Sequence, residues 1–432
     1  MNFYNLKHKE EQLNFKEATI KGQGKDKGLF FPEDISKFSN EFLQNLPNLS
    51  NEEIAFQVMK DFAGDEIPEA ELRKIVAETI AFEIPLKKVT ENISVLELFH
   101  GPTLAFKDVG ARFMSRCLGY FLKNETRKVT VLVATSGDTG GAVANGFYDV
   151  EGIEVVILYP KNRVSPVQEK QLTALGKNIH ALEVNGSFDD CQALVKQAFS
   201  DESLNEKLLL TSANSINVAR WLPQQIYYVL ALKQWLKINS ENPVICVPSG
   251  NFGNICAGIL AHHRGLPVEH FIAACNVNDV VPEYLRTEIL KPKETVATIS
   301  NAMDVGDPSN FVRILELFDK EFNQVKNKLS GYTIDDEETL KTIERVEKDY
   351  GYVLDPHGAV AFVALEKYLA ENGGKGFFLE TAHPVKFPDS VEKATGKSVE
   401  IPKSLEELMK QGKFTTEINP QYEELKEFLL KK

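Results

Sequence analysis

Short apolar runs alternate with helical stretches along most of the chain. From residue 129 onward, β-branched runs such as 129–133 and 153–159 are each followed by a segment with helical periodicity. Short continuous apolar strands separated by helices are typical of parallel sheets with helices on both faces. The pattern therefore predicts an α/β fold, in which ligands bind in the loops that leave the carboxyl ends of strands. Further runs of this kind are 179–184, 244–247, 268–275 and 376–379.

The first 90 residues follow a different pattern. Residues 51–63 and 69–81 have helical periodicity, and residues 22–34 before them are rich in turn-forming side chains. We therefore expect a separate, mostly helical N-terminal domain. The expected domains are 1–90, a large α/β domain formed by 91–110 and 215–400, a smaller α/β domain formed by 111–214, and a C-terminal helical segment at 401–432.

Composition narrows the class of protein. The 432 residues are 43% hydrophobic and 26% charged, as in ordinary globular proteins. The net charge is −13 and basic residues do not gather into runs, so we expect no nucleic-acid partner. No segment approaches the ~18–20 apolar residues of a membrane span. The five scattered cysteines lack CxxC spacing, which favours reduced thiols and no metal site, and the N-terminus has no secretory pattern. We expect a cytoplasmic protein without a membrane partner.

One lysine has an unusual setting. The segment 100–110, HGPTLAFKDVG, places Lys107 among Ala105, Phe106 and Val109 just before a helical run. Burial disfavours an ammonium ion and lowers its pKa, which makes a lysine a nucleophile able to form a Schiff base. The alternative is a lysine that keeps its charge in water while its stem covers apolar surface.

Residues 248–254, PSGNFGN, lie between a predicted strand and a predicted helix. Gly250 and Gly253 allow backbone N–H groups to face inward at the helix start, which makes an anion site, and Ser249, Asn251 and Asn254 add neutral donors. The segment lacks the lysine of a Walker loop and the GxGxxG pattern, so a nucleotide loop is excluded. A cofactor phosphate and a plain tight turn remain equal alternatives here.

A second loop of this type, ATSGDTGG at 134–141, offers the Ser136 and Thr139 hydroxyls to a carboxylate or phosphate. Asp138 within the loop counts against anion binding by every residue, and it could instead cap the helix. Two such loops in one chain favour a ligand with two anionic ends.

Two further polar segments are candidates for ligand contacts. Residues 211–220, TSANSINVAR, open a helix and end in Arg220, whose guanidinium suits a bidentate contact to phosphate; a series of helix caps is the alternative. Thr381 follows the strand 376–379, and a hydroxyl opposite a pyridine nitrogen gives a neutral hydrogen bond. His383 receives no role.

These motifs occur in the order found in the threonine synthases, and the chain resembles that family from residue 14 to about 390. The family consists of pyridoxal-phosphate enzymes of the tryptophan synthase β-subunit fold group, or fold type II. The resemblance implies two parallel-sheet domains with flanking helices and an N-terminal domain. The matching stretches are 14–18, 28–32, 100–110, 135–141, 214–220, 250–254, 301–304 with 308–311, 355–358 and 381–384.

The resemblance also implies roles for individual residues. Lys107 would hold pyridoxal 5'-phosphate and act as the base, and Thr381 would face the cofactor's ring nitrogen. No metal is implied. Asp138 stands where some relatives have Asn and Gly358 where Thr is expected, and neither Asp138 nor His357 is assigned a role. Gly250, Asn251, Phe252, Gly253 and Asn254 would cradle the cofactor phosphate, and Ser136, Thr139, Asn214, Ser215 and Arg220 would bind substrate anions.

The reaction implied is the conversion of O-phospho-L-homoserine into L-threonine and phosphate, by a monomer or a homodimer. Another lyase of the same fold, such as a serine/threonine dehydratase, is one alternative, but those relatives usually carry consecutive glycines where this chain has Gly250-Asn-Phe-Gly-Asn. A catalytically silent binding protein is the other. Retention of Lys107, the loop 250–254 and Thr381 argues against it.

Overall fold

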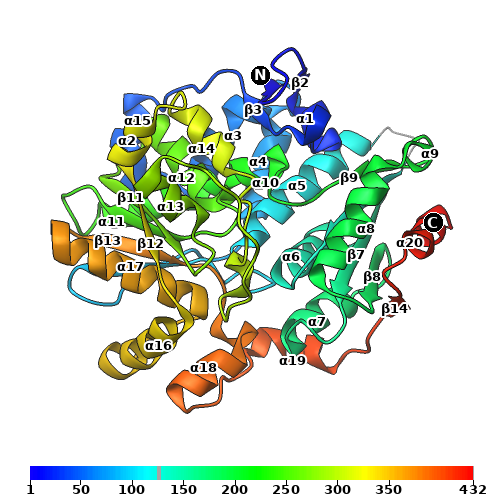
Figure 1. The fold of residues 1–432 in the computed structure, drawn as a ribbon. Coiled ribbons are helices and arrows are strands. Elements are labelled where there is room, and N and C mark those ends of the chain that lie inside the picture. The colour runs from blue at the N-terminus through cyan, green and yellow to red at the C-terminus, as the bar shows by residue number, and fades with distance from the viewer. Residues whose placement is uncertain (124–127, 432) are drawn as a thin grey trace.

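Two sheets of mainly parallel strands form the centre of the protein, each covered by helices (Figure 1). The computed structural model describes residues 1–123 and 128–431. The α/β class expected from the apolar runs and the two parallel sheets implied by the family resemblance are confirmed.

The larger sheet has six strands, and only the edge pair β4–β5 is antiparallel. Every residue of the central strands β10, β13 and β5 is buried, as expected where helices cover both faces. Ile93–Glu97 enters this sheet beside β13, although the two strands lie far apart in sequence. The order is β12 (Leu329–Thr333), β11 (His270–Cys275), β10 (Val244–Pro248), β13 (Gly376–Glu380), β5 (Ile93–Glu97) and β4 (Leu86–Lys88).

The smaller sheet has five strands, all parallel. Its edge strand β14 belongs to the C-terminal segment, where we expected only helix, and its Thr415 pairs with Ala181. Figure 1 shows this segment crossing from the large lobe to the outer edge of the small one. The order is β14 (Thr415–Ile418), β8 (Ile179–Val184), β7 (Ile153–Pro160), β6 (Val129–Ala134) and β9 (Leu209–Thr211).

The N-terminal residues contain a short antiparallel sheet besides the expected helices. Strands β1 (Asn2–Asn5), β2 (Gln12–Asn14) and β3 (Phe30–Pro32) pair in the order β2-β1-β3. Apolar side chains of this region, including Phe3 and Phe15, share one continuous core with Phe113 of α5 and Phe147 of α6. The helices here are α1 (Phe15–Lys21), α2 (Asn40–Asn45), α3 (Asn51–Ala63) and α4 (Glu69–Thr79).

The remaining helices cover the sheets or extend along the surface. Two of them, α10 and α11, are divided by a 3₁₀ turn that contains Pro223, because proline cannot donate a helical hydrogen bond. Their bounds are α5 (Lys107–Leu122), α6 (Asp138–Phe147), α7 (Pro166–Thr173), α8 (Phe188–Ser200), α9 (Glu202–Asn205), α10 (Val218–Trp221), α11 (Gln225–Trp235), α12 (Gly253–His263), α13 (Val280–Thr287), α14 (Phe311–Leu317), α15 (Phe322–Lys328), α16 (Asp336–Tyr350), α17 (Pro356–Asn372), α18 (Pro388–Thr395), α19 (Lys403–Lys410) and α20 (Tyr422–Leu430).

Candidate active site

Lys107 is the first residue of α5, at the end of a loop fixed to the carboxyl end of the large sheet. The backbone N–H of Phe106 donates to the carbonyl oxygen of Thr381 at 2.9 Å, and Ala105 forms a β-bridge with Ala382. Leu104 in this loop adopts a positive φ of 56°, a conformation that the neighbouring contacts must maintain. The loop therefore brings Lys107 close to the Thr381 segment.

The surroundings of Lys107 favour its neutral amine. Loss of contact with water lowers the pKa of Lys107 to about 8; the negative charge of Asp138 opposes this shift, and the positive charges of Lys386 and Arg220 add to it. A lysine with a pKa near the working pH can act both as nucleophile and as base.

The loop 250–254 connects β10 to α12 and presents its backbone inward. Phe252 has a φ of 62°, which starts the helix from a left-handed residue. Across the described residues, the N–H groups of Phe252, Gly253 and Asn254 have no hydrogen-bond acceptor, as expected at an open helix start. A Cβ on Gly250 would lie 2.6 Å from Cα of Met303, so only glycine fits there. The loop has the donors of an anion cradle.

The two asparagines of this loop shape it through their side chains. Asn254 Nδ2 donates to the carbonyl oxygen of Pro248 at 2.8 Å. Asn251 Nδ2 donates to Ser215 Oγ at 2.6 Å, and Asn251 Oδ1 accepts from the N–H of Ser309 at 2.7 Å. Ser215, which we assigned to substrate, therefore lies directly against the loop assigned to the cofactor phosphate. Its neighbour Asn214 is in the same segment, partly exposed.

Arg220 on α10 is a buried cation with unused hydrogen-bonding capacity. Its Nη1 donates to the carbonyl oxygen of Ala213, while Nε has no partner among the described residues. Burial lowers the pKa of Arg220 to about 10, an effect that the charge of Asp108 opposes. A buried guanidinium with a free N–H, close enough to influence Lys107, suits an anionic ligand.

The loop before α6 exposes the two hydroxyls that the sequence indicated. Thr135 Oγ1 accepts from the N–H groups of Gly137 and Gly140 and so shapes the turn, while Ser136 and Thr139 remain partly exposed. The suggestion that Asp138 caps this helix is wrong. Asp138 is the first residue of α6, makes no capping hydrogen bond, and directs its carboxylate to side chains outside the helix.

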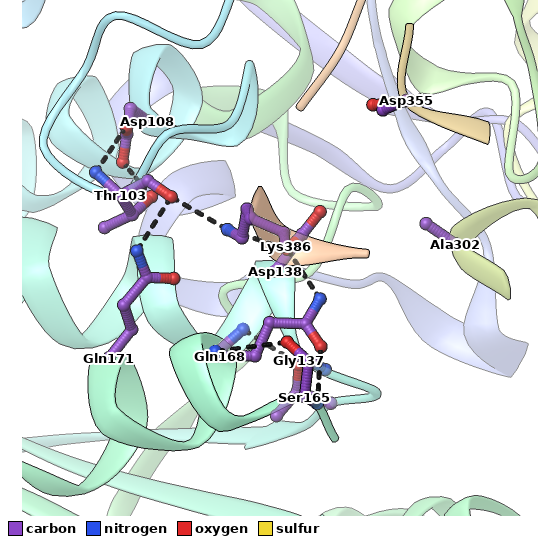
Figure 2. A network of polar contacts seen from close by, with 12 residues as sticks. Thr103, Asp108, Gly137, Asp138, Ser165, Gln168, Gln171, Ala302, Asp355 and Lys386 are labelled. Carbon is purple, nitrogen blue, oxygen red and sulfur yellow. Dashed lines mark hydrogen bonds and ion pairs between the residues drawn. The ribbon is translucent and has the colours of Figure 1, made fainter. Parts of the chain in front are cut away.

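Those partners are Lys386 and Gln168, and Figure 2 shows them together. Lys386 Nζ lies 2.7 Å from Asp138 Oδ1, and Gln168 Nε2 donates to the same oxygen at 2.9 Å. Lys386 is fully buried. The positive charges of Lys386 and Lys107 hold the pKa of Asp138 well below its usual range despite burial. Sequence analysis missed Lys386, because a lysine in a short proline-containing turn carries no local sign of burial.

A cluster of buried carboxyl groups and histidines lies behind Thr381. Asp355 caps α17 by accepting from the N–H groups of His357 and Gly358, and His357 Nε2 accepts from the N–H of Ala302 at 3.2 Å. Burial raises the pKa of Glu380 well above its usual range, with the charge of Asp355 acting in the same direction. A Cβ on Gly358 would lie 1.6 Å from Glu380 Oε2, so the glycine that departs from the family pattern leaves space for that carboxyl group.

The residues present fit pyridoxal phosphate. The site offers a lysine with a lowered pKa, a loop with free N–H groups for a phosphate, and Thr381 on the segment beside the lysine loop.

Among the described residues, no group of three His, Cys, Asp or Glu side chains could hold a metal ion. No helix in the same residues is long and apolar enough to cross a membrane. All five cysteines are buried and free of disulfides.

The sequence matches three protein families along its length. Residues 80–377 match the family described as pyridoxal-phosphate dependent enzyme. The chain is therefore a pyridoxal-phosphate enzyme of fold type II. Residues 2–80 match the threonine synthase N terminus and residues 358–429 the threonine synthase C-terminal family. The protein belongs to the threonine synthase family.

Individual relatives cover the whole chain. Threonine synthase of Haemophilus influenzae is 46% identical, with both chains covered fully, and that of Escherichia coli is 47% identical over 94% of each chain. The crystal structure of the E. coli enzyme superposes with a TM-score of 0.93 at 45% identity and full coverage of both chains. A pyridoxal-phosphate-bound threonine synthase from Brucella melitensis gives a TM-score of 0.93 at 35% identity, covering 99% of this chain and 98% of that one.

Proposed function

We propose that the protein converts O-phospho-L-homoserine and water into L-threonine and inorganic phosphate, as the last step of threonine biosynthesis. The observation that carries the proposal is the meeting of Lys107, the Thr381 segment and the loop 250–254 at the carboxyl end of one sheet. Full-length identity of 46% to a threonine synthase supports the same conclusion.

Each part of the site has a proposed task. Residues 250–254, that is Gly250, Asn251, Phe252, Gly253 and Asn254, hold the cofactor phosphate through their N–H groups. Thr381 offers a neutral hydrogen bond to the ring nitrogen. The bound cofactor supplies the electron sink that makes the substrate's α-proton acidic.

Lys107 Nζ takes that proton in our proposal, because its lowered pKa keeps part of the amine neutral near pH 8. Arg220 binds the substrate's phosphate, and its buried positive charge stabilises this group more strongly as the leaving dianion forms. Ser136 and Thr139 bind the second anionic end. Asn214 and Ser215 complete the substrate site next to Asn251.

Location and assembly complete the proposal. We propose a cytoplasmic enzyme, monomer or homodimer, with no nucleic-acid partner, which agrees with the net charge of −13. The proposed domains are 1–90, 91–110 with 215–400, 111–214 and 401–432. Two features of the sheets support this division: residues 93–97 pair with residues 376–380, and residues 129–211 supply four of the five strands of the smaller sheet. Leu86–Lys88, before the proposed boundary at residue 90, also joins the larger sheet through residues 94–96.

Substrate comparison tests this function. The purified protein is incubated with O-phospho-L-homoserine, L-serine or L-threonine, and phosphate, amino acids and 2-oxo acids are measured. The proposal expects phosphate and threonine from the first substrate only. A 2-oxo acid as the main product of serine or threonine would support a dehydratase instead, and no turnover of any substrate would support a binding protein.

A further inference from the structure

Lys386 connects three segments of the site that are far apart in sequence. It lies in the 3₁₀ turn Pro384–Lys386 directly after the Thr381 segment. Its ammonium group donates to the carbonyl oxygen of Thr103 at 2.8 Å and pairs with Asp138 Oδ1 at 2.7 Å. Thr103 lies in the loop that carries Lys107, and Asp138 begins α6 over the smaller sheet. One buried side chain therefore joins the lysine loop, the small sheet and the end of β13 (Figure 2).

The contacts around Thr103 show how firmly the lysine loop is held. The Thr103 carbonyl also accepts from Gln171 Nε2 at 3.0 Å, and the Thr103 hydroxyl donates to Asp108 Oδ1 at 2.5 Å. The Thr103 N–H donates to Asp108 Oδ2 at 2.9 Å. Without the ammonium of Lys386, the Thr103 carbonyl would keep only the neutral amide of Gln171.

Charged side chains from several elements act on the amine of Lys107. Three charged groups act on its amine: Asp138 from α6, Lys386 from the turn after β13, and Arg220 from α10. Lys386 and Asp138 pair with one another, so a proton on Lys107 would add a second positive charge near Arg220. Such an arrangement disfavours the ammonium form of Lys107.

We propose that Lys386 is a positioning residue: its buried ammonium fixes the Asp138 carboxylate and the carbonyl of Thr103 in the loop that carries Lys107, and so sets the surroundings of the Lys107 amine. This inference rests on the proposed role of Lys107 as nucleophile and base. It gives Asp138 a role as well, as the buried partner of the Lys386 ammonium group.

The test measures Lys107 protonation directly, apart from turnover. The cofactor-free protein is acetylated briefly with acetic anhydride between roughly pH 6 and 11, and the fraction of labelled Lys107 is read by peptide mass spectrometry. Lys386→Met removes a neighbouring positive charge while Asp138 stays, so the pKa of Lys107 rises by about one unit or more. Asp138→Asn removes the negative charge and lowers it. Lys386→Arg keeps the charge and leaves the midpoint close to that of the wild type.

Two further variants keep the test decisive if Lys386→Met does not fold. The double variant Lys386→Met/Asp138→Asn buries no unpaired charge and should titrate near the wild type. Asp61→Asn is the matched control, because it removes the partner of the buried Arg264 outside this cluster and should leave the pKa of Lys107 unchanged. In the holoenzyme, kcat is measured as a function of pH for the wild type, Lys386→Met and Lys386→Arg. The pH midpoints of kcat should fall in the same order as the midpoints of Lys107 labelling.

A purely structural Lys386 would lower stability without moving the Lys107 titration. Equal midpoints in the wild type, Asp138→Asn and any folded Lys386→Met would overturn the proposal, as would a lower midpoint in Lys386→Met. Turnover of O-phospho-L-homoserine by the wild type is scored separately. A failure of the proposed function is thereby distinguished from a failure of this inference.

Discussion

Phe106 and Thr381 are joined by a backbone hydrogen bond of 2.9 Å, although 275 residues separate them in the chain. The bond places the residue before Lys107 against the residue proposed to face the cofactor ring. Because both segments leave neighbouring parallel strands, β5 and β13, their relative position is set by the sheet register, in which Glu380 pairs with Glu97.

Replacement of Lys107 by alanine should remove turnover. Loss of a covalent nucleophile and base typically costs a thousandfold or more, so we expect kcat to fall by at least about 10³. The loop 250–254 is untouched, so circular dichroism and thermal unfolding should show an intact fold. A variant that makes threonine at nearly the wild-type rate would exclude Lys107 from the reaction.

Arg220→Ala should impair substrate use more than cofactor binding. Loss of a charge-assisted contact to phosphate costs about 2–4 kcal/mol, which corresponds to roughly 30- to 1,000-fold in kcat/KM. KM should rise and kcat fall, while the dissociation constant of pyridoxal phosphate changes little. The control is Arg264→Ala, a buried arginine paired with Asp61 outside the site, which should affect stability first.

Should Arg220→Ala release the cofactor while KM is kept, the two phosphate sites are assigned the wrong way round. Asn254→Ala provides the contrast, because its side chain holds the loop through Pro248 and its loss should weaken cofactor retention first.

Thr381→Asp should change the reaction outcome more than the stability. A carboxylate opposite the ring nitrogen would favour a protonated ring and a stronger electron sink, which invites transamination. The absorbance spectrum of the cofactor and the ratio of 2-oxo acid to threonine measure the change. Unchanged spectra and products would show that Thr381 does not face the ring.

Gly358→Ala should destabilise the protein, because its Cβ would lie 1.6 Å from Glu380 Oε2. Overpacking of this kind costs about 1–3 kcal/mol in the free energy of unfolding. Urea unfolding of Gly358→Ala, Glu380→Ala and the double variant forms a cycle, in which the double variant recovers part of the loss. Additive effects in this cycle would contradict the steric explanation.

Uptake of the cofactor should depend on pH through Lys107. The neutral amine is the reactive form, and the pKa of Lys107 is lowered to about 8. The rate at which cofactor-free protein binds pyridoxal phosphate should therefore rise as the pH increases through about 8 and then level off. Stopped-flow absorbance measures this rate. A midpoint near the ordinary lysine pKa of about 10.4 would show that burial does not tune Lys107.

The sequence predicted the parts of the fold that depend on local pattern. The run 129–133 was predicted as a strand and lies within β6, because a strand buried on both faces needs a continuous apolar stretch. Strands β1, β2 and β3 were missed, since segments of three or four residues carry no measurable alternation and depend on antiparallel partners.

The site also divides into residues with local sequence signals and residues whose role depends on distant partners. Lys107 and the loop 250–254 could be singled out from the sequence because their glycines and apolar neighbours are local signals, and their roles stay predictions. The partner of Asp138 was not predictable, because Lys386 lies 248 residues further along and its burial results from tertiary packing. The contact of Ser215 with Asn251 was missed for the same reason.

The most direct measurement of the central claim is the stoichiometry of products from O-phospho-L-homoserine. Phosphate and threonine are quantified over one time course in the wild type and in Lys107→Ala. The account predicts equal amounts of phosphate and threonine from the wild type and neither above background from Lys107→Ala. Phosphate released without threonine, or threonine formed equally by both proteins, would contradict it.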